Sequence, residues 1–314
     1  FKRLKVSDQF KALVLNQECD KFTRVIKSLD KSFLKHGDVT IKVDYSDLNF
    51  KDGMILKNGG RLVKEFPHIP GIDFSGNVLE SDNPKFKQGD EVILTGFRVG
   101  EVFYGGYSQV AKVNGEFLVK KPKNLTTKQA MILGTAGFTS LMSAFAIKAR
   151  EEILLGEKVN NVLVTGATGG VGSVAVIVLN RMGYNVTAVT GKDSKADYLK
   201  SLGAKTVVNR SEFDKDPRLI DKGLWDGVVD TVGGKILANA IVQTNSNGII
   251  AVCGNASTNE LNTNVIPFML RGIKMWGMDS ANCSIKRREF IWGEAANLID
   301  FSLLEKSIQT VSLE

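Results

Sequence analysis

A glycine-rich turn in the middle of the chain limits the fold more than any other feature of the sequence. The segment Thr165–Ser173 reads Thr-Gly-Ala-Thr-Gly-Gly-Val-Gly-Ser, and it lies between an apolar run and a stretch with helical spacing. A strand, a tight glycine turn and a helix in this order are typical of a dinucleotide-binding βαβ unit. The alternative is a glycine-rich turn without a ligand, which would not require a strand before it and a helix after it. The turn therefore predicts a Rossmann domain whose helix N-terminus binds phosphate through Ala167, Thr168, Gly169, Gly170, Val171 and Gly172.

The segments around this turn alternate between two kinds of secondary structure. The expected strands cover residues 161–165, 185–189, 206–208, 227–230, 248–253 and 273–278. The expected helices cover residues 171–182, 194–202 and 235–243. Such alternation predicts right-handed βαβ units, and hence an α/β fold with a doubly wound parallel sheet that helices cover on both faces.

The preceding part of the chain has a different pattern. Short β-rich segments, bounded by Gly, Asp, Asn or Pro, cover residues 11–15, 22–27, 39–45, 73–79, 91–95 and 107–113. A long helical pattern follows over residues 127–149. With 314 residues the chain is long enough for two domains. We expect a partly open antiparallel barrel over residues 1–128, to which residues 281–314 return, and a Rossmann domain over residues 129–280.

The end of the second Rossmann strand distinguishes NAD from NADP. NAD enzymes usually place Asp or Glu there to hold the ribose 2′-hydroxyl, whereas this chain continues with Thr190-Gly191-Lys192-Asp193. Asp193 would be that acid only if the strand ended later, and we interpret it as a charge at the start of the next helix. A hydroxyl and a cation suit a 2′-phosphate. The sequence favours NADPH, bound at this end by Thr190, Gly191, Lys192, Tyr198 and Arg210.

Charge and composition argue against several other classes of protein. The net charge is +7, but no run of five basic residues occurs, so we do not expect nucleic acid as a partner. The diffuse positive field would attract anionic ligands such as a dinucleotide or coenzyme A. No segment approaches 18 uninterrupted apolar residues, which predicts no membrane span. Three separated cysteines and the absence of an apolar leader near the start indicate a reducing cytoplasm.

Metal ligands are scarce in this sequence. The three cysteines Cys19, Cys253 and Cys283 are far apart, and the two histidines are His36, expected at the surface, and His68, expected to be structural or at a pocket rim. Zinc needs three or four convergent ligands, so we expect no metal. Without zinc to polarise an alcohol, an activated carbon–carbon double bond is the better electrophile. Its hydride adduct is an enolate, which N–H or O–H donors stabilise.

A β-rich domain ahead of a nucleotide domain resembles the medium-chain dehydrogenase/reductase superfamily. The Gly-His-Glu motif of its zinc-dependent members reads Gly71-Ile72-Asp73 here, and Val43–Gly53 is similar to the barrel signature of its zinc-independent quinone-oxidoreductase-like group. Further segments narrow the resemblance to the acrylyl-CoA reductase branch. They are Phe66–Asp73, Leu94–Phe97, Val99–Glu101, Gly105–Gly106, Gly134–Thr139, Tyr198–Ala204 and Asp230–Gly234. The likeness runs from about Lys11 to the end of the chain.

The resemblance implies a GroES-like barrel, an active cleft between the two domains, and NADPH-dependent reduction of acrylyl-CoA to propanoyl-CoA. It also implies a further helix and a closing strand beyond Glu314. Asn49 and Asp52 match the family's active-site segment. Tyr45 and Asn49 are candidates for orienting substrate or donating to the enolate. Asp52 is the third candidate catalytic residue, and its alternative role is that of a purely structural hydrogen-bond acceptor. The positions expected to line the cofactor are Phe50, Thr135, Thr139, Asn255, Ile266 and Ser280.

Several of these positions leave alternatives open. Phe50 stands where family members often carry Tyr, so a hydroxyl there cannot be essential. The hydroxyls of Thr135 and Thr139 would reach the nicotinamide or ribose, or would bond back within their own helix. The loop that follows Gly96 differs from the family at Arg98 and Phe103. Arg98 is a candidate for binding a CoA phosphate, and Tyr104 is the other candidate substrate residue.

The function has two alternatives, and the last strand suggests an assembly. NADPH:quinone reduction shares the fold, and a non-catalytic NADPH-binding protein, such as one that binds RNA, would share the nucleotide domain. In the expected edge strand 273–278, Ile273, Met275, Trp276 and Met278 would face solvent in a monomer. Pairing with a second copy would cover that edge, which predicts a homodimer.

Overall fold

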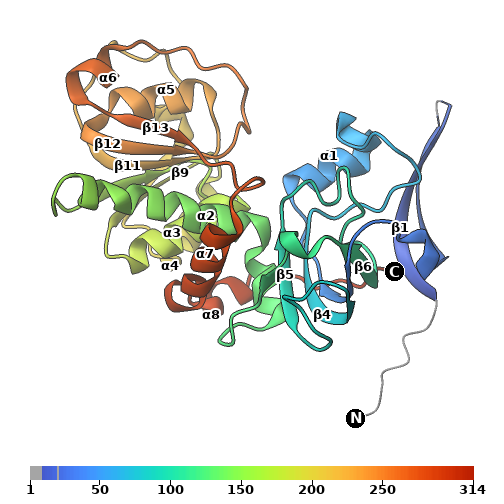
Figure 1. Ribbon diagram of the computed structural model, residues 1–314. Helices are drawn as coiled ribbons and strands as arrows, with labels where there is room; N and C mark the ends of the chain where they lie inside the picture. Colours follow the sequence, from blue (N-terminus) through green and yellow to red (C-terminus); the bar gives the residue numbers. More distant parts are fainter. Residues whose placement is uncertain (1–8, 20) are drawn as a thin grey trace. The chain divides into compact units, whose positions relative to one another are not determined.

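The chain divides into two compact units in the computed structural model, which describes residues 9–19 and 21–314. Unit 1 comprises Phe1–Thr135, Ala281–Gly293 and Leu304–Glu314, and unit 2 comprises Ala136–Ser280 and Glu294–Leu303 (Figure 1). The division differs from the expected one in two places. The main boundary falls after Thr135 rather than after residue 128, and residues 294–303, expected with the barrel, belong to unit 2 because their contacts are mainly with that unit.

Unit 1 is built on a five-stranded antiparallel sheet. Its strands are β3 (Val39–Tyr45), β4 (Asp73–Ser81), β5 (Glu91–Thr95), β6 (Val110–Val113) and β7 (Val119–Lys120), in the order β6-β3-β4-β5-β7. The bounds of β3 and β5 are those that the sequence predicts. One apolar cluster includes Ile41, Phe74 and Leu94, which are fully buried. The sheet thus has its own core, as expected for the GroES-like barrel domain.

A long hairpin and a short helix complete this unit. The strands β1 (Gln9–Glu18) and β2 (Lys21–Asp30) form a separate two-stranded sheet, and β1 also bridges to Ser108 and His68. Helix α1 (Phe50–Asn58) lies in a region that the sequence pattern assigned only to strands. That prediction was wrong because α1 has only nine residues and weak amphipathic spacing. The Asp52 carboxylate stabilises its first turn by accepting the Asn49 N–H.

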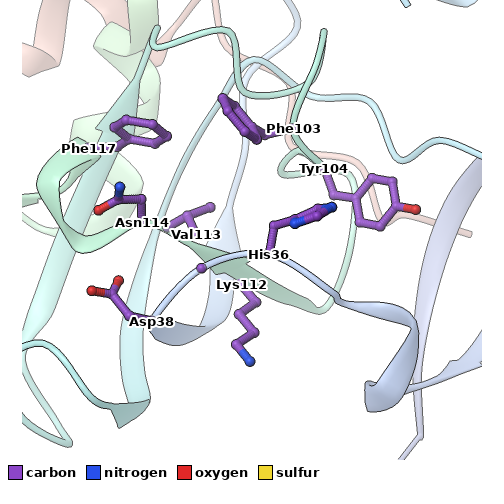
Figure 2. Close-up of a pocket in the computed structure, with 9 residues that line it drawn as sticks. His36, Asp38, Phe103, Tyr104, Lys112, Val113, Asn114 and Phe117 are labelled. Atoms are coloured by element: carbon purple, nitrogen blue, oxygen red, sulfur yellow. The ribbon is translucent and has the colours of Figure 1, made fainter. Parts of the chain in front are cut away.

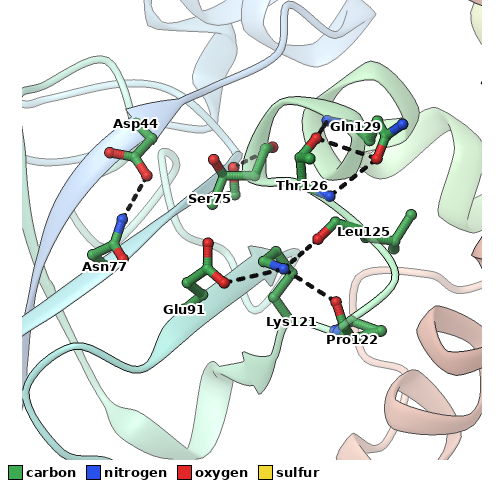
Figure 3. Close-up of polar contacts among 10 residues, drawn as sticks. Asp44, Ser75, Asn77, Glu91, Lys121, Pro122, Leu125, Thr126 and Gln129 are labelled. Carbon is green, nitrogen blue, oxygen red and sulfur yellow. Dashed lines mark hydrogen bonds and ion pairs between the residues drawn. The ribbon is translucent and has the colours of Figure 1, made fainter.

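The longest described helix begins in unit 1, where local polar contacts stabilise its first turn. Helix α2 (Thr127–Ile153) starts with a reciprocal pair, since Gln129 Oε1 accepts the Thr126 N–H at 3.0 Å and Thr126 Oγ1 accepts the Gln129 N–H at 3.1 Å (Figure 3). The Lys121 ammonium pairs with Glu91 at 3.2 Å and donates to the Leu125 carbonyl, and thereby joins β5 to the start of the helix. In length and composition α2 could cross a membrane, but 78% of its most apolar window is buried inside the protein, as in a core helix.

Unit 2 contains a six-stranded parallel sheet in the order β10-β9-β8-β11-β12-β13. The strands are β8 (Asn161–Val164), β9 (Asn185–Thr190), β10 (Thr206–Asn209), β11 (Trp225–Asp230), β12 (Thr244–Val252) and β13 (Lys274–Gly277). Helices α3 (Gly170–Arg181) and α4 (Ala196–Ser201) cover one face, and α5 (Gly234–Val242) and α6 (Ile266–Arg271) cover the other (Figure 1). The predicted doubly wound Rossmann fold is confirmed. Its strand order reverses between β8 and β11, and ligands bind at such a point in this fold class.

Two helices close the chain. Helix α7 (Ile285–Leu298) carries Arg288 and Trp292, both 1% exposed, and α8 (Phe301–Glu305) follows it. Arg288 belongs to unit 1, where its guanidinium donates to Thr95 Oγ1 at 2.6 Å and to the Ala281 carbonyl at 2.9 Å. It also lies 4.4 Å from the ring centroid of Phe97. The segment 281–293 is thereby fixed to the end of β5.

Candidate active site

A fully buried carboxylate organises the polar residues of unit 1. Asp73, the first residue of β4, accepts four hydrogen bonds. The donors are the Asp47 N–H at 3.2 Å, Asn49 Nδ2 at 2.9 Å, the Thr135 N–H at 2.9 Å and Thr135 Oγ1 at 2.7 Å. So many donors can stabilise a buried negative charge. Asp73 therefore fixes the orientation of Asn49 and Thr135, two residues that the sequence singled out from segments far apart in the chain.

Asp52, a candidate catalytic residue, has structural partners. Its side chain is fully buried, and Oδ2 accepts the Asn49 N–H at 2.9 Å while Oδ1 accepts the Ile72 N–H at 3.1 Å. Burial, and next the charge of Asp73, raise its pKa to about 6. Both carboxylate oxygens thus bind the backbone, which favours the structural alternative for this residue.

Asp47 is the third carboxylate of this group, and the sequence did not single it out. Its Oδ1 accepts the Leu48 N–H at 2.7 Å. Its Oδ2 lies 2.5 Å from the point that a Cβ on Gly134 would occupy. Burial, followed by the charge of Asp73, raises the pKa of Asp47 to about 7. This carboxyl can therefore exchange a proton near neutral pH.

Tyr107 adds a hydroxyl to the same group. Its Oη donates to the Asp47 carbonyl at 3.0 Å. Burial and then the charges of Asp52, Asp73 and Asp47 raise its pKa far above the ordinary value, so the phenol stays neutral. We call Asp47, Asn49, Asp52, Asp73, Tyr107 and Thr135 the carboxylate network.

Sequence reasoning missed half of this network for a clear reason. Asp47 and Asp73 lie inside motifs that carried the family resemblance, but nothing local shows that their carboxylates approach each other. The one available signal was Asp73 itself, a charged residue between Ile72 and Phe74 at the start of a buried strand. A charge in that position needs buried donors.

The other unit 1 candidates lie outside the network. Tyr45 is half-buried in β3, opposite Ser75, and its hydroxyl makes no hydrogen bond with residues 9–19 or 21–314. Phe50, at the start of α1, is 80% exposed. Arg98 has a left-handed backbone (φ 59°) and an exposed side chain whose nearest acidic partner is Glu101 at 3.9 Å. Tyr104 stacks on Phe33 at 5.2 Å.

The two histidines behave differently. His36 is exposed. His68 is 2% exposed, its Nε2 lies 2.9 Å from the Gly100 carbonyl, and its backbone bridges to Leu15. Burial lowers the pKa of His68, so the ring is neutral at physiological pH. Its role is structural.

In unit 2 the glycine turn has the geometry of a phosphate site. Gly169 caps α3, and the N–H groups of Gly170, Val171 and Gly172 have no acceptor in the described part of the chain. A Cβ on Gly172 would lie 2.4 Å from the Gly166 carbonyl oxygen, so only glycine fits this close approach of helix and turn. Thr168 and Ala167 complete the turn, and Ala167 is fully buried. Free N–H groups at a helix N-terminus fit a pyrophosphate.

The end of β9 is arranged for a negatively charged group. Lys192 and Arg210 are both exposed, and the Arg210 side chain packs against Gly191, where its Cδ and Nε lie 2.8 Å from a Cβ built on that glycine. Thr190 Oγ1 accepts the Lys192 N–H at 3.1 Å. Asp193 begins a 3-10 turn and accepts from Asn209 Nδ2 at 2.6 Å. Asp193 therefore lies beyond the strand end, as interpreted, and two cations occupy the position next to Gly191.

The remaining cofactor candidates are dispersed over unit 2 and α2. Tyr198 lies in α4, where the Lys195 ammonium stands 5.9 Å from its ring centroid. Asn255 follows β12 and bonds to Asn259, Ile266 opens α6, and Ser280 follows β13. Thr139 lies in α2, is 5% exposed, and its carbonyl accepts from Ser143 Oγ at 2.8 Å.

The residues present do not fit zinc. In residues 9–19 and 21–314, no group of three or more His, Cys, Asp and Glu side chains is placed to hold a metal ion. Cys19, Cys253 and Cys283 form no disulfide bond within the described residues. Burial, followed by the charge of Asp230, raises the pKa of Cys253 to about 12, which disfavours the thiolate that zinc requires.

Comparisons with known proteins identify the family. The family model for the alcohol dehydrogenase GroES-like domain matches residues 35–123, and the one for zinc-binding dehydrogenases matches residues 170–296. Acrylyl-CoA reductase AcuI of Ruegeria pomeroyi is 43% identical over 97% of this chain and 92% of its own length. A second relative, YhfP of Bacillus subtilis, is 42% identical over 98% of this chain and 93% of its own length. Its name assigns it provisionally to the quinone oxidoreductases.

Two crystal structures are similar over nearly the whole chain. Escherichia coli YhdH with bound NADPH has a TM-score of 0.90 and 41% identity, and covers 96% of this chain and 92% of its own. The NAD-bound YhfP of B. subtilis has a TM-score of 0.90 and 42% identity, with 95% and 90% covered. A GroES-like domain joined to this Rossmann domain defines a medium-chain dehydrogenase/reductase. Within that class the chain belongs to the quinone-oxidoreductase-like family that contains the acrylyl-CoA reductase AcuI, so the predicted resemblance is confirmed.

Proposed function

We propose that this protein reduces the carbon–carbon double bond of acrylyl-CoA to give propanoyl-CoA, with NADPH as the cofactor and without zinc. The observation that carries the proposal is the 43% identity to an acrylyl-CoA reductase over 97% of the chain. A similar structure contains NADPH. The lack of a zinc ligand set in the described residues suits a reaction that needs proton and hydrogen-bond donors.

Unit 2 binds the cofactor in this proposal. When bound, NADPH supplies the hydride that adds to the β-carbon of the substrate. The N–H groups of Gly170–Gly172 bind the pyrophosphate, and Lys192 with Arg210 binds the 2′-phosphate. The other expected contacts, which are Phe50, Thr135, Thr139, Thr190, Tyr198, Asn255, Ile266 and Ser280, belong to the same proposal.

Unit 1 handles the charge and the proton in this proposal. Hydride addition leaves negative charge on the thioester oxygen, which the Asn49 amide and the Tyr45 hydroxyl are the candidates to stabilise. Asp73 holds the Asn49 side chain at 2.9 Å, and Asp52 holds its backbone, so both act as positioning residues. The α-carbon then needs a proton. Asp47, with its pKa raised to about 7 by burial, can give that proton and regain it from water.

The test is a comparison of substrates. NADPH oxidation would be followed with acrylyl-CoA, with crotonyl-CoA and with a quinone, each at matched concentration. Fast turnover confined to acrylyl-CoA is the expected result. Turnover with the quinone alone would contradict the substrate while leaving the fold and cofactor unaffected, and the similarity to YhfP is the observation that favours that second function. Tight NADPH binding with no turnover of any of them would instead indicate a non-catalytic binding protein.

The proposal includes a homodimer formed through unit 2. Among the described strands, β13 pairs with β12 alone, and its Met275 and Trp276 are 41% and 39% exposed. Met269 and Leu270 of α6 are 75% and 70% exposed. Ile273, expected to face solvent, is 5% exposed, so that expectation was wrong: the residue packs into the core before the strand begins. We also propose a cytoplasmic location, in keeping with three cysteines that form no disulfide bond in the described part of the chain.

A further inference from the structure

A pocket of about 350 Å³ lies in unit 1, apart from the glycine turn of unit 2. Three groups of residues line it: His36–Asp38 ahead of β3, Phe103 with Tyr104, and Lys112–Asn114 with Phe117 at the end of β6 and just after it. Its volume is within the range of small-molecule sites. Figure 2 shows Asp38 and Asn114 on one side of the pocket, Tyr104 on the opposite side, and Phe103 and Phe117 together at the top.

The aromatic walls offer flat faces that are held in place. Phe117 stacks on Phe97, with centroids 4.8 Å apart and planes at 8°, and the Arg288 guanidinium lies over the ring of Phe97. Phe103 is 5.6 Å from Phe117 and 36% exposed. Tyr104 is fixed by its stacking on Phe33. Rigid aromatic faces that remain partly exposed suit a planar ring.

The polar groups at the pocket match the edge of a purine. Asn114 Oδ1 accepts the Glu116 N–H at 2.9 Å, whereas its Nδ2 has no acceptor among residues 9–19 and 21–314. That amide can donate to a ring nitrogen. The Asp38 carboxylate accepts the Gly115 N–H at 2.7 Å and Asn83 Nδ2 at 3.0 Å, and each oxygen has a second lone pair for an exocyclic amine.

Lys112 and His36 complete the site. Within the described residues, neither Lys112 nor His36 has an ion-pair partner. By contrast, seven other described lysines form an ion pair with a carboxylate, and Lys274 donates to a backbone carbonyl. In Figure 2 His36 lies between Lys112 and Tyr104. An unpaired ammonium beside an aromatic pocket suits a phosphate group.

The pocket is also connected to the carboxylate network by five consecutive residues. Phe103 and Tyr104 line the pocket, while the Gly106 N–H donates to the Gly71 carbonyl at 2.9 Å and the Tyr107 hydroxyl donates to the Asp47 carbonyl. A ligand with a nucleotide at one end and a reactive thioester at the other could therefore use both places.

We propose that this pocket binds the adenosine 3′,5′-bisphosphate end of the acyl-CoA substrate. The proposal rests on the proposed function. Phe103 and Phe117 enclose the adenine, Asn114 and Asp38 bind its edge, and Lys112 with His36 binds phosphate. The flexible pantetheine arm then carries the thioester to the carboxylate network.

The test compares Lys112→Ala, Phe103→Ala and Asn114→Asp with the control Lys42→Ala, an exposed lysine of neighbouring β3 outside the pocket. Asn114→Asp keeps the oxygen that caps the following turn but removes the Nδ2 donors. We expect the KM for acrylyl-CoA to rise about tenfold in each pocket variant with little change in kcat, because only ground-state binding is lost. Acrylyl-pantetheine, which lacks the nucleotide, should show the same KM in all four variants and in the native protein.

Direct binding separates this proposal from the proposed function. Calorimetry with adenosine 3′,5′-bisphosphate should show binding that Lys112→Ala weakens about tenfold, whereas adenosine 2′,5′-bisphosphate, which matches one half of NADP, should bind equally well to both proteins. Unchanged affinity for the 3′,5′ compound, or an unchanged KM in an active enzyme, would overturn the pocket assignment. If the native protein did not reduce acrylyl-CoA, the proposed function would fail, and the calorimetry alone would decide what the pocket binds.

Discussion

Asp47 is the single residue whose ionisation should be easiest to detect. Burial and the charge of Asp73 raise its pKa from 3.8 to about 7. Between these two pH values the folded state holds a proton that the unfolded state releases. The free energy of unfolding therefore falls as the pH rises from about 4 to about 7, and the loss is complete above that range.

This fall of the free energy of unfolding with rising pH gives a prediction for Asp47→Asn. The variant keeps an oxygen for the Leu48 N–H and cannot ionise. At about pH 8 we expect it to be more stable than the native protein by on the order of 1–2 kcal/mol, and at about pH 4 we expect the two to be similar. Urea unfolding at both pH values measures the difference. An equal difference at the two pH values would show that Asp47 does not titrate in the folded state.

The sequence could predict only part of the carboxylate network. Asn49 and Asp52 belong to one motif, and their mutual bond is local, since the Asp52 carboxylate stabilises the first turn of its own helix. Asp73 meets Thr135 across 62 residues, and Tyr107 meets Asp47 across 60. These contacts depend on how strands and turns close into a domain, and no local spacing encodes them.

Among the helices and strands, α2 is the one whose shape depends most clearly on a single residue. Gly134 interrupts the helix with φ 50° and ψ −153°. A Cβ there would meet Asp47 Oδ2 at 2.5 Å in a backbone conformation that non-glycine residues rarely adopt. The kink places the Thr135 N–H and hydroxyl on Asp73.

We therefore expect Gly134→Ala to lower the free energy of unfolding by about 2–4 kcal/mol, through strain and the displaced carboxylate. The control is Gly53→Ala in α1, where nothing lies within 4 Å of the added methyl group. In an open helical position alanine should be neutral or stabilising by up to about 1 kcal/mol. Chemical denaturation of both variants decides the matter, and equal stabilities would refute a special role for Gly134.

The end of β9 carries the prediction for cofactor choice. Lys192→Ala removes one of the two cations next to Gly191, and we expect the KM for NADPH to rise about tenfold while the KM for NADH stays within about twofold. Steady-state kinetics with both cofactors measure this. A parallel rise for both would mean that Lys192 does not contact the 2′-phosphate, a real alternative since one similar structure contains NAD.

At this scale the sequence predicts regular elements well and irregular ones poorly. Strands β3 and β5 end where the pattern does, because each alternates or stays apolar between clear turn residues. The helix expected over residues 194–202 is instead a 3-10 turn followed by the six-residue α4. Helix α1 was missed altogether. Short helices depend on capping contacts and packing rather than on periodicity.

For the whole molecule, the fold class follows from the sequence because one glycine turn between a strand and a helix permits few alternatives. The division into units does not follow as well. Residues 294–303 belong to unit 2 through their packing, although the segments on either side of them, residues 281–293 and 304–314, belong to unit 1. The assembly of copies is equally hard to predict from the sequence, since it depends on which surfaces of the folded chain remain exposed.

The exposed edge of unit 2 leads to a prediction about that assembly. In the described part of the chain β13 has a neighbouring strand on one side alone, and the exposed Met275 and Trp276 make this edge strand apolar, a combination that proteins usually cover. We expect the native protein to sediment as a dimer. The double variant Met275→Glu, Trp276→Glu should sediment as a monomer, because buried like charges would face each other across a twofold axis.

The control is Leu155→Glu, at a residue of the same unit that is 97% exposed, and this variant should remain dimeric. A native monomer would exclude the assembly, and a dimeric double variant would move its interface away from β13. Sedimentation velocity over a range of protein concentrations distinguishes these results, since a dimer held by one strand edge should dissociate on dilution once that edge is charged.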